Sequence, residues 1–188
     1  MNHPFVPTLL PPAIFWWPVA GVGAAPEAQN TILSGLFSVI HPDHAEFVSM
    51  GNWTSQDVLG RTMQSMLSIF ALGAEDGLSA IQAFQLLQDV SRAVQLDPNL
   101  KASLAGRRFA LVFSSTRSAQ PNLTLESQLV PLLKKCGLIY LGAYWHYAGA
   151  HPGWRLQNGP KAQAFKGRVE SEMQAMFAQA TAENRAYV

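Results

Sequence analysis

The chain has 188 residues, of which 48% are hydrophobic and only 13% are charged, and its net charge is +1. This length suits one domain with a sizeable core, and the near-zero net charge excludes a global field that would attract nucleic acid or an acidic membrane. One cysteine, Cys136, excludes an internal disulfide and a cysteine-based zinc cage.

The first 12 residues are rich in proline, and they lack the basic start and the uninterrupted apolar run of a signal peptide. No other stretch is long and apolar enough to span a bilayer. We therefore predict an extended arm over residues 1–12, a single domain over residues 13–188 and a cytoplasmic location.

Short apolar runs and stretches of helical periodicity alternate along the first half of the domain. The strand-like runs are Ala13–Ala20, Ala45–Met50 and Met66–Leu72. Helices are predicted from Pro26 to about Val39, from Thr54 or Ser55 to Met63, and from Ser79 to about Gln95. The segment with His41, Asp43 and His44 is interpreted as a surface turn rather than a metal site.

The second half continues the alternation. We predict a turn at Gly73–Gly77, a loop at Asp97–Asn99, strands at Arg108–Ser115 and Leu138–Ala143, and helices at Leu123–Lys135 and about Lys161–Glu183. Gly137 stands where a glycine commonly ends a helix. A long loop is predicted after the last strand, and it contains Trp145, His146, Tyr147, His151 and Trp154.

Strands that alternate with helices predict an α/β fold in which a parallel sheet is covered on both faces. The expected architecture is the flavodoxin-like three-layer sandwich, with a five-stranded parallel sheet of order 2-1-3-4-5. Ligands on such sheets bind at the carboxyl ends of the strands. The loops that matter here follow strands one, three and four, and they are Gly21–Ala25, Gly73–Gly77 and Ser114–Asn122.

Two segments of the second half carry recognisable motifs. Leu104-Ala105-Gly106-Arg107 precedes RFALVFSST, and Thr124-Leu125 precedes a leucine-rich helix and CGLIYLG. They resemble the "LAGK, apolar strand, S-T" and "T-L, helix, H-G-M-I-x-V-G" segments of NAD(P)H:quinone oxidoreductases of the tryptophan-repressor-binding-protein type. The resemblance covers about residues 13–186 and is clearest from 66 to 143. It implies a flavodoxin-like fold, an FMN cofactor, reduction of quinones with NAD(P)H, and a tetramer.

The resemblance also carries the flavin site onto three groups of positions. They are Ala20, Gly21, Val22, Gly23, Ala24 and Ala25 at the phosphate, then Ala74, Glu75, Asp76 and Gly77, and then Ser114, Ser115, Thr116 and Arg117 beside the ring.

The loops that hold FMN in this family are altered in this chain. The family's phosphate loop carries hydroxyls, whereas no Ser or Thr lies between Trp17 and Asn30, and Glu27 adds a negative charge there. The family's P-T-R-aromatic-G loop is replaced by GAEDG at residues 73–77, and its G-G-Q-E-T-T loop by AQPNLT at residues 119–124. Three altered loops imply that FMN binding is weakened or lost.

Two pairs of residues could act on a ligand at these loops. His146 and His151 lie in an aromatic segment, which suits hydrogen-bond donation or general acid chemistry on a flat apolar molecule. Glu75 and Asp76 could exchange a proton if one of them is desolvated. The aromatic segment is also consistent with simple packing or a subunit contact, and the carboxylates with a solvated turn.

The sequence leaves three functions open. The first is a quinone reductase that passes hydride from NAD(P)H through FMN to a quinone. The second is a flavin-free subunit or scaffold, in a homo-oligomer or with a partner protein; the low charge favours it, although a surface of Gln, Asn, Ser and Thr would also explain that low charge. The third is a crevice rebuilt for non-redox chemistry on a small aromatic ligand, with His146 or His151 acting beside Glu75 or Asp76.

Overall fold

The computed structural model describes residues 12–16, 46–50, 53–73, 77–115, 123–147 and 154–186. Within them, the strands are β1 (Ala13–Trp16), β2 (Glu46–Ser49), β3 (Leu67–Gly73), β4 (Arg108–Ser115) and β5 (Ile139–Tyr147). They form one sheet in the order β2-β1-β3-β4-β5, and every neighbouring pair is parallel. The α/β fold with a parallel sheet that the alternation predicted is thereby confirmed.

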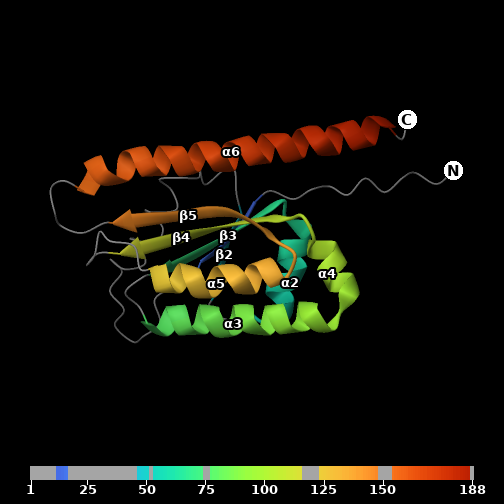
Figure 1. Ribbon diagram of the computed structural model, residues 1–188, viewed down its shortest axis with the longest axis horizontal. Coiled ribbons are helices and arrows are strands. Elements are labelled where there is room, and N and C mark those ends of the chain that lie inside the picture. The colour runs from blue at the N-terminus through green and yellow to red at the C-terminus, as the bar shows by residue number, and fades with distance from the viewer. Residues whose placement is uncertain are drawn as a thin grey trace.

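Helices cover both faces of this sheet (Figure 1). The described helices are α2 (Ser55–Gln64), α3 (Gly77–Leu96), α4 (Pro98–Leu104), α5 (Leu123–Lys135) and α6 (Trp154–Ala186). The helix α6 lies alone among them on one face, and α2 to α5 lie on the other. The helix predicted from Pro26 to Val39 and the last four residues of the first predicted strand lie outside the described residues.

The two faces of the sheet have separate hydrophobic cores, because side chains alternate along each strand. One core joins Phe15, Phe70 and Leu111 to α2, α3, α4 and α5. The other core joins Ile69 and Val112 to α6, which contributes the side chains of Ala162, Phe165 and Val169. The central strand β3 is fully buried along its whole length, as a parallel strand covered on both faces must be.

The structure corrects three boundaries. Asp97–Asn99 is not a loop, because the Asp97 carboxylate caps α4 by accepting hydrogen bonds from the N–H groups of Asn99 and Leu100. The last strand does not end at Ala143 but continues to Tyr147, and α6 begins at Trp154 rather than Lys161. The predicted long aromatic loop is therefore mostly strand and helix within the described residues.

The outer strand β5 contains an irregularity. Its pairing with β4 shifts by one residue between Phe109 and Ala110, which pair with Tyr140 and Gly142 respectively. Gly142 has a φ of +132°, and a Cβ on it would come within 2.6 Å of the Arg168 guanidinium, so the position requires glycine. Arg168 Nη1 donates a hydrogen bond of 2.9 Å to the Leu141 carbonyl and so joins α6 to this bulge.

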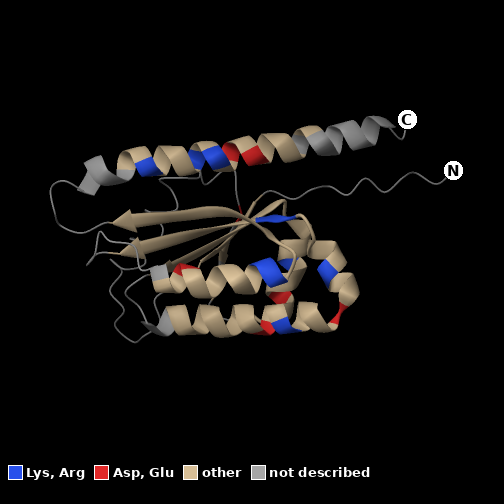
Figure 2. Cartoon of the chain, viewed as in Figure 1, with Lys and Arg blue, Asp and Glu red and all other residues tan. Residues whose placement is uncertain are grey.

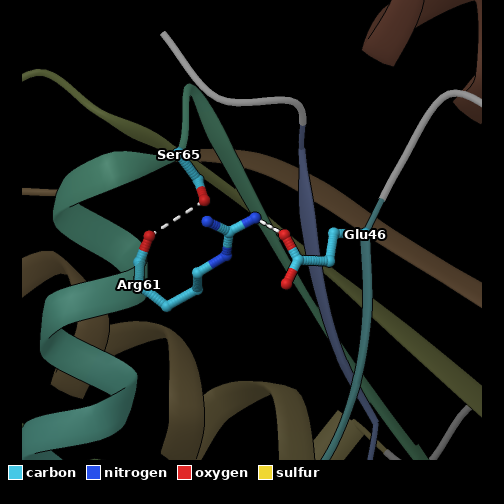
Figure 3. Close-up of polar contacts among 3 residues, drawn as sticks. All are labelled: Glu46, Arg61 and Ser65. Carbon is cyan, nitrogen blue, oxygen red and sulfur yellow. Dashed lines mark hydrogen bonds and ion pairs between the residues drawn. The ribbon is translucent and has the colours of Figure 1, made fainter. Parts of the chain in front are cut away.

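Polar contacts join the elements at the amino edge of the sheet (Figure 3). Arg61, near the end of α2, forms an ion pair with Glu46, the first residue of β2. The Ser65 hydroxyl donates to the Arg61 carbonyl at 2.9 Å. Arg107 Nη1 donates to the Ser65 carbonyl at 2.7 Å and thereby connects the start of β4 to the same corner.

We predict that Gly137→Ala destabilises the fold by about 1–2 kcal/mol, because L side chains are strained at positive φ. Gly137 has a φ of +87°, and a Cβ there would come within 3.3 Å of the Ala105 Cα atom. Gly60→Ala is the control, since Gly60 is helical and a Cβ there would meet no described atom within 4 Å. The control should leave stability unchanged or raise it by up to about 1 kcal/mol. Equal urea midpoints for the two variants would contradict the prediction.

Candidate functional site

The carboxyl edge of the sheet is the candidate site, because ligands on parallel sheets bind there. Gly73, Ser114 and His146 lie side by side at this edge, since Gly73 pairs with Ser114 and Ser114 pairs with His146. One position further, Ser115 pairs with Tyr147. Paired residues of neighbouring parallel strands point to the same face, so each of these rows faces one side of the sheet.

The two serines that end β4 face opposite sides. Ser114 lies two residues after Val112 and so shares its face, which is the core under α6. Ser115 lies two residues after Phe113 and so shares the face of the core under α3 and α5. Both are buried, with exposed fractions of 3% for Ser114 and 6% for Ser115. The Ser114 hydroxyl has no hydrogen-bond partner among the described residues. A buried hydroxyl without a partner is costly, so its presence calls for an explanation.

His146 stands next to Ser114 on the α6 face and is 4% exposed. Its Nδ1 atom is hydrogen bonded to the hydroxyl of Tyr144 at 3.2 Å, and the two rings lie 6.0 Å apart. The Tyr144 ring in turn packs against Phe165 of α6, at 5.9 Å between centroids. Burial lowers the pKa of the His146 imidazole, so this side chain is neutral at physiological pH.

The opposite face of β5 is packed into the core. Trp145 stacks on Phe113 with ring centroids 4.1 Å apart. Its indole Nε1 donates to Glu126 Oε2 at 3.5 Å, and the Tyr140 hydroxyl donates to Glu126 Oε1 at 2.7 Å. Burial, the hydrogen bond and the Glu126 charge all raise the pKa of Tyr140. These contacts favour the packing interpretation for Trp145 over a role in lining a ligand crevice.

The described first turns of α3 and α5, at the carboxyl edge, contain no basic residue. Both helices run from the carboxyl edge back to the amino edge, and their basic residues Arg92, Lys134 and Lys135 lie in the second half of each (Figure 2). The one charged residue in the described first turns of these helices is Glu126, an acid. No described cation on this face is therefore placed to neutralise a phosphate at the carboxyl edge.

Most of the predicted site lies outside the described residues. This applies to the six phosphate-loop positions from Ala20 to Ala25, to Ala74, Glu75 and Asp76, to Thr116 and Arg117, and to His151. Of the others, Gly77 begins α3, while Ser114, Ser115 and His146 lie at the carboxyl edge. The structure thus brings Ser114 and His146 together from two neighbouring strands, whereas the sequence analysis predicted a loop at His146.

Tyr144 is the residue at this edge that sequence reasoning missed. The signal was present in the alternation of β5, because Tyr144 and His146 are two positions apart and therefore share a face. Ending the strand at Ala143 concealed it. Cys136 is buried, and burial raises the pKa of its thiol, so it acts as a core residue. The described residues contain no cluster of His, Cys, Asp and Glu that could hold a metal ion.

No known family model matches the sequence, and no curated protein matches it. Solved structures do resemble it in three dimensions. The Trp repressor binding protein of Bacillus subtilis matches with a TM-score of 0.58 and 15% identity, over 82% of this chain and 95% of that one. The general stress protein 14 of Treponema denticola, solved in complex with FMN, matches with a TM-score of 0.56 and 12% identity, over 87% and 99%.

An NADPH-quinone reductase of P. pentosaceus matches with a TM-score of 0.54 and 10% identity, over 84% of this chain and 96% of that one. At such identities the likeness establishes the fold alone. The chain has a flavodoxin-like fold, and this supports the resemblance to flavodoxin-like quinone oxidoreductases at the level of architecture. None of the described helices is both long and apolar enough to span a membrane.

We predict that His146 makes the fold sensitive to mild acid. Burial lowers its folded-state pKa below the ordinary imidazole value of 6.5, so the unfolded chain takes up a proton first as the pH falls. The contribution of the neutral His146 side chain to the free energy of unfolding is therefore fully present above pH 6.5, and it is lost as the pH falls towards the folded-state pKa. From pH 7.5 to 5.5, the free energy of unfolding should fall by up to about 1 kcal/mol more in the wild type than in His146→Phe.

Urea unfolding at both pH values gives, for each protein, the change in the free energy of unfolding with pH. Comparing these changes cancels the loss of the Tyr144 hydrogen bond, because that loss lowers the stability of His146→Phe equally at both pH values. Identical slopes for the two proteins would show that the His146 imidazole is not desolvated.

Proposed function

We propose that this chain is a flavodoxin-like protein related to FMN-dependent NAD(P)H:quinone oxidoreductases whose carboxyl edge has lost tight binding of FMN. Its function would then be that of a flavin-free subunit, in a homo-oligomer or with a partner protein. The observation that carries the proposal is the charge expected at this edge. The sequence has two carboxylates directly after β3, and the described cations of α3 and α5 lie towards the opposite edge. An FMN phosphate is a dianion and needs the opposite arrangement.

We infer the position of the acidic pair from the strand and the helix beside it, since the pair itself lies outside the described residues. Strand β3 ends at Gly73 and α3 begins at Gly77, so only residues 74–76 connect them. These residues are Ala74, Glu75 and Asp76, and the family that the sequence resembles has an arginine in this loop. We therefore expect the two carboxylates at the carboxyl edge, where they would repel an anionic ligand.

The described hydroxyls do not compensate for this charge. Ser114 and Ser115 are at the correct edge, but they face opposite sides of the sheet and are both buried. A phosphate site needs several donors that converge on one point, as helix N-termini and clustered hydroxyls provide. The described hydroxyls therefore do not form a phosphate site, and the phosphate-loop positions lie outside the described residues. We derive no reaction step through FMN.

We predict that removing the acidic pair strengthens binding of FMN but not of riboflavin. Each carboxylate at roughly 10 Å from a phosphate weakens binding by about 0.5 kcal/mol in water, so Glu75→Gln with Asp76→Asn should raise FMN affinity roughly fivefold. Riboflavin has the same ring without the phosphate, so its affinity should stay unchanged. Quenching of flavin fluorescence during titration measures both affinities.

The matched control is Asp89→Asn with Glu170→Gln, which makes the same change in net charge. Asp89 lies on α3 and Glu170 on α6, and both side chains are exposed. This control should leave both flavin affinities unchanged, because distant exposed charges are screened by salt. Equal gains in the two double variants would show that net charge, rather than the loop, controls the affinity.

The visible absorption spectrum of the purified wild-type protein tests the proposal directly. A colourless protein that stays colourless after excess FMN is added and free FMN is removed supports it. Stoichiometric bound flavin would overturn it and favour the second candidate, a working quinone reductase. The likeness to a structure solved with FMN and to an NADPH-quinone reductase favours that second candidate, for which NAD(P)H oxidation with a quinone acceptor is the assay.

A further inference from the structure

The amino edge of the sheet carries a cluster of positive side chains, opposite the edge where ligands of this fold bind. Lys101 lies in the last turn of α4, and Lys134 and Lys135 lie in the last turn of α5. Arg107 lies between α4 and β4. Figure 2 shows the basic residues of α4, α5 and the start of β4 at this one end of the sheet. We call Lys101, Arg107, Lys134 and Lys135 the amino-edge basic patch.

Two paired turns bring these four residues together. The Gly106 N–H donates to the Gly137 carbonyl at 3.1 Å, and the Ile139 N–H donates to the Arg107 carbonyl at 2.7 Å. A Cβ on Gly137 would lie 3.6 Å from the Lys101 carbonyl oxygen. The ends of α4 and α5 therefore pack directly against each other, and the cations lie on or beside the two turns.

The patch has no carboxylate to neutralise it within the described part of the chain. None of its four cations forms an ion pair there. On α6, Arg168 adds a further positive charge near the start of β5, where it binds the Leu141 carbonyl. The described carboxylates all have other partners: Glu46 pairs with Arg61, Asp89 with Arg92, Glu170 with Lys166 and Glu172 with Arg108, while Asp57 and Asp97 cap helices and Glu126 accepts from Tyr140.

Helix dipoles explain only part of this charge. The carbonyl ends of α4 and α5 each carry roughly half a negative charge, so together they offset about one of the four positive charges. The Arg107 guanidinium is held in place, because its Nε and Nη1 atoms donate to the carbonyls of Ser103 and Ser65 at 3.0 and 2.7 Å. Burial lowers its pKa, so this charge loses hydration without gaining a described carboxylate. An excess of about three positive charges remains.

We propose that the amino-edge basic patch binds a short acidic segment of a partner protein. About three carboxylates on one segment would match the excess charge. The surface consists of described residues only, and it does not depend on whether FMN binds at the opposite edge. Its role rests on the proposed function, because it specifies the kind of partner that a flavin-free subunit would hold.

An exposed apolar side chain beside the cations favours a protein segment over other polyanions. Ile139 is 46% exposed at the start of β5, directly after the turn that ends α5. Lys134 Nζ lies 5.9 Å from the centre of the Tyr140 ring, which limits the freedom of this cation. Elsewhere along this edge, arginines are neutralised by Glu46 and Glu172. The unneutralised surface is therefore small, which suits a short segment better than a long nucleic acid or a membrane.

The test uses two fluorescently labelled peptides that share a length and differ in charge. One is acetyl-Gly-Glu-Glu-Leu-Glu-Glu-Gly, and the other has glutamine in place of each glutamate. Fluorescence anisotropy measures binding to the wild-type chain, and NMR follows the backbone amide signals of Gly106 and Gly137. We expect the glutamate peptide to bind about tenfold more tightly at about 20 mM salt and to lose most of this advantage at about 300 mM, because salt shortens the Debye length. Both glycine signals should shift.

Lys134→Ala with Lys135→Ala should weaken binding of the glutamate peptide about fivefold, since exposed ion pairs are individually weak. Ile139→Thr should weaken both peptides, because it removes apolar area and leaves the charge unchanged. The matched control is Lys161→Ala with Lys166→Ala, which makes the same change in net charge on α6, on the other face of the sheet. This control should leave the affinity of the glutamate peptide unchanged.

Four results would overturn the proposal. Equal affinities for the two peptides would show that charge is not recognised. An equal loss in the two lysine double variants would show that net charge, rather than the patch, controls binding. Unchanged glycine signals at saturation would place the peptide elsewhere. Tighter binding of a short oligothymidine, or of phosphatidylserine vesicles, would assign the patch to nucleic acid or to a membrane. None of these results bears on FMN binding, which the absorption spectrum decides separately.

Discussion

The seven-residue ladder between β3 and β4 is the constraint on which the rest of the molecule depends. Both strands are buried on both faces over almost their whole length, so every backbone N–H and C=O must find its partner within the sheet. Helices must then cover each face with apolar side chains. The parallel direction of the strands also requires each connection to return along a helix, which gathers the strand ends and their loops at one edge.

Much of this architecture could be predicted from the sequence, because buried strands and amphipathic helices leave strong local patterns. Strand β4 and helix α5 were predicted with the bounds that the structure shows. The failures have physical causes. Asp97 and Pro98 suggested a loop, although the same two residues also cap and begin a helix. Strand β5 was cut short because Trp145 and His146 break the apolar pattern while remaining strand residues.

The candidate site was less predictable, since it depends on register rather than on local pattern. Sequence alone placed Ser114 at a strand end and His146 in a loop, and nothing in their spacing showed that they are neighbours. Their proximity comes from the pairing of β4 with β5, a long-range contact that period and propensity do not encode. The loop positions from Ala20 to Ala25 and from Ala74 to Asp76 lie outside the described residues, so their assignment stays a prediction.

The bulge in β5 decides which chemistry faces which helix. Because Leu141 is the extra residue, Ala110 pairs with Gly142, and further along Ser114 pairs with His146. If Leu141 instead paired with Ala110, each later residue of β5 would move one place along β4, and Trp145 would stand beside Ser114. An indole would then occupy the polar corner, and the imidazole would enter the aromatic core beneath α5. A single inserted residue, made possible by Gly142, thus puts His146 beside Ser114 on the α6 face and Trp145 against Phe113 on the opposite face.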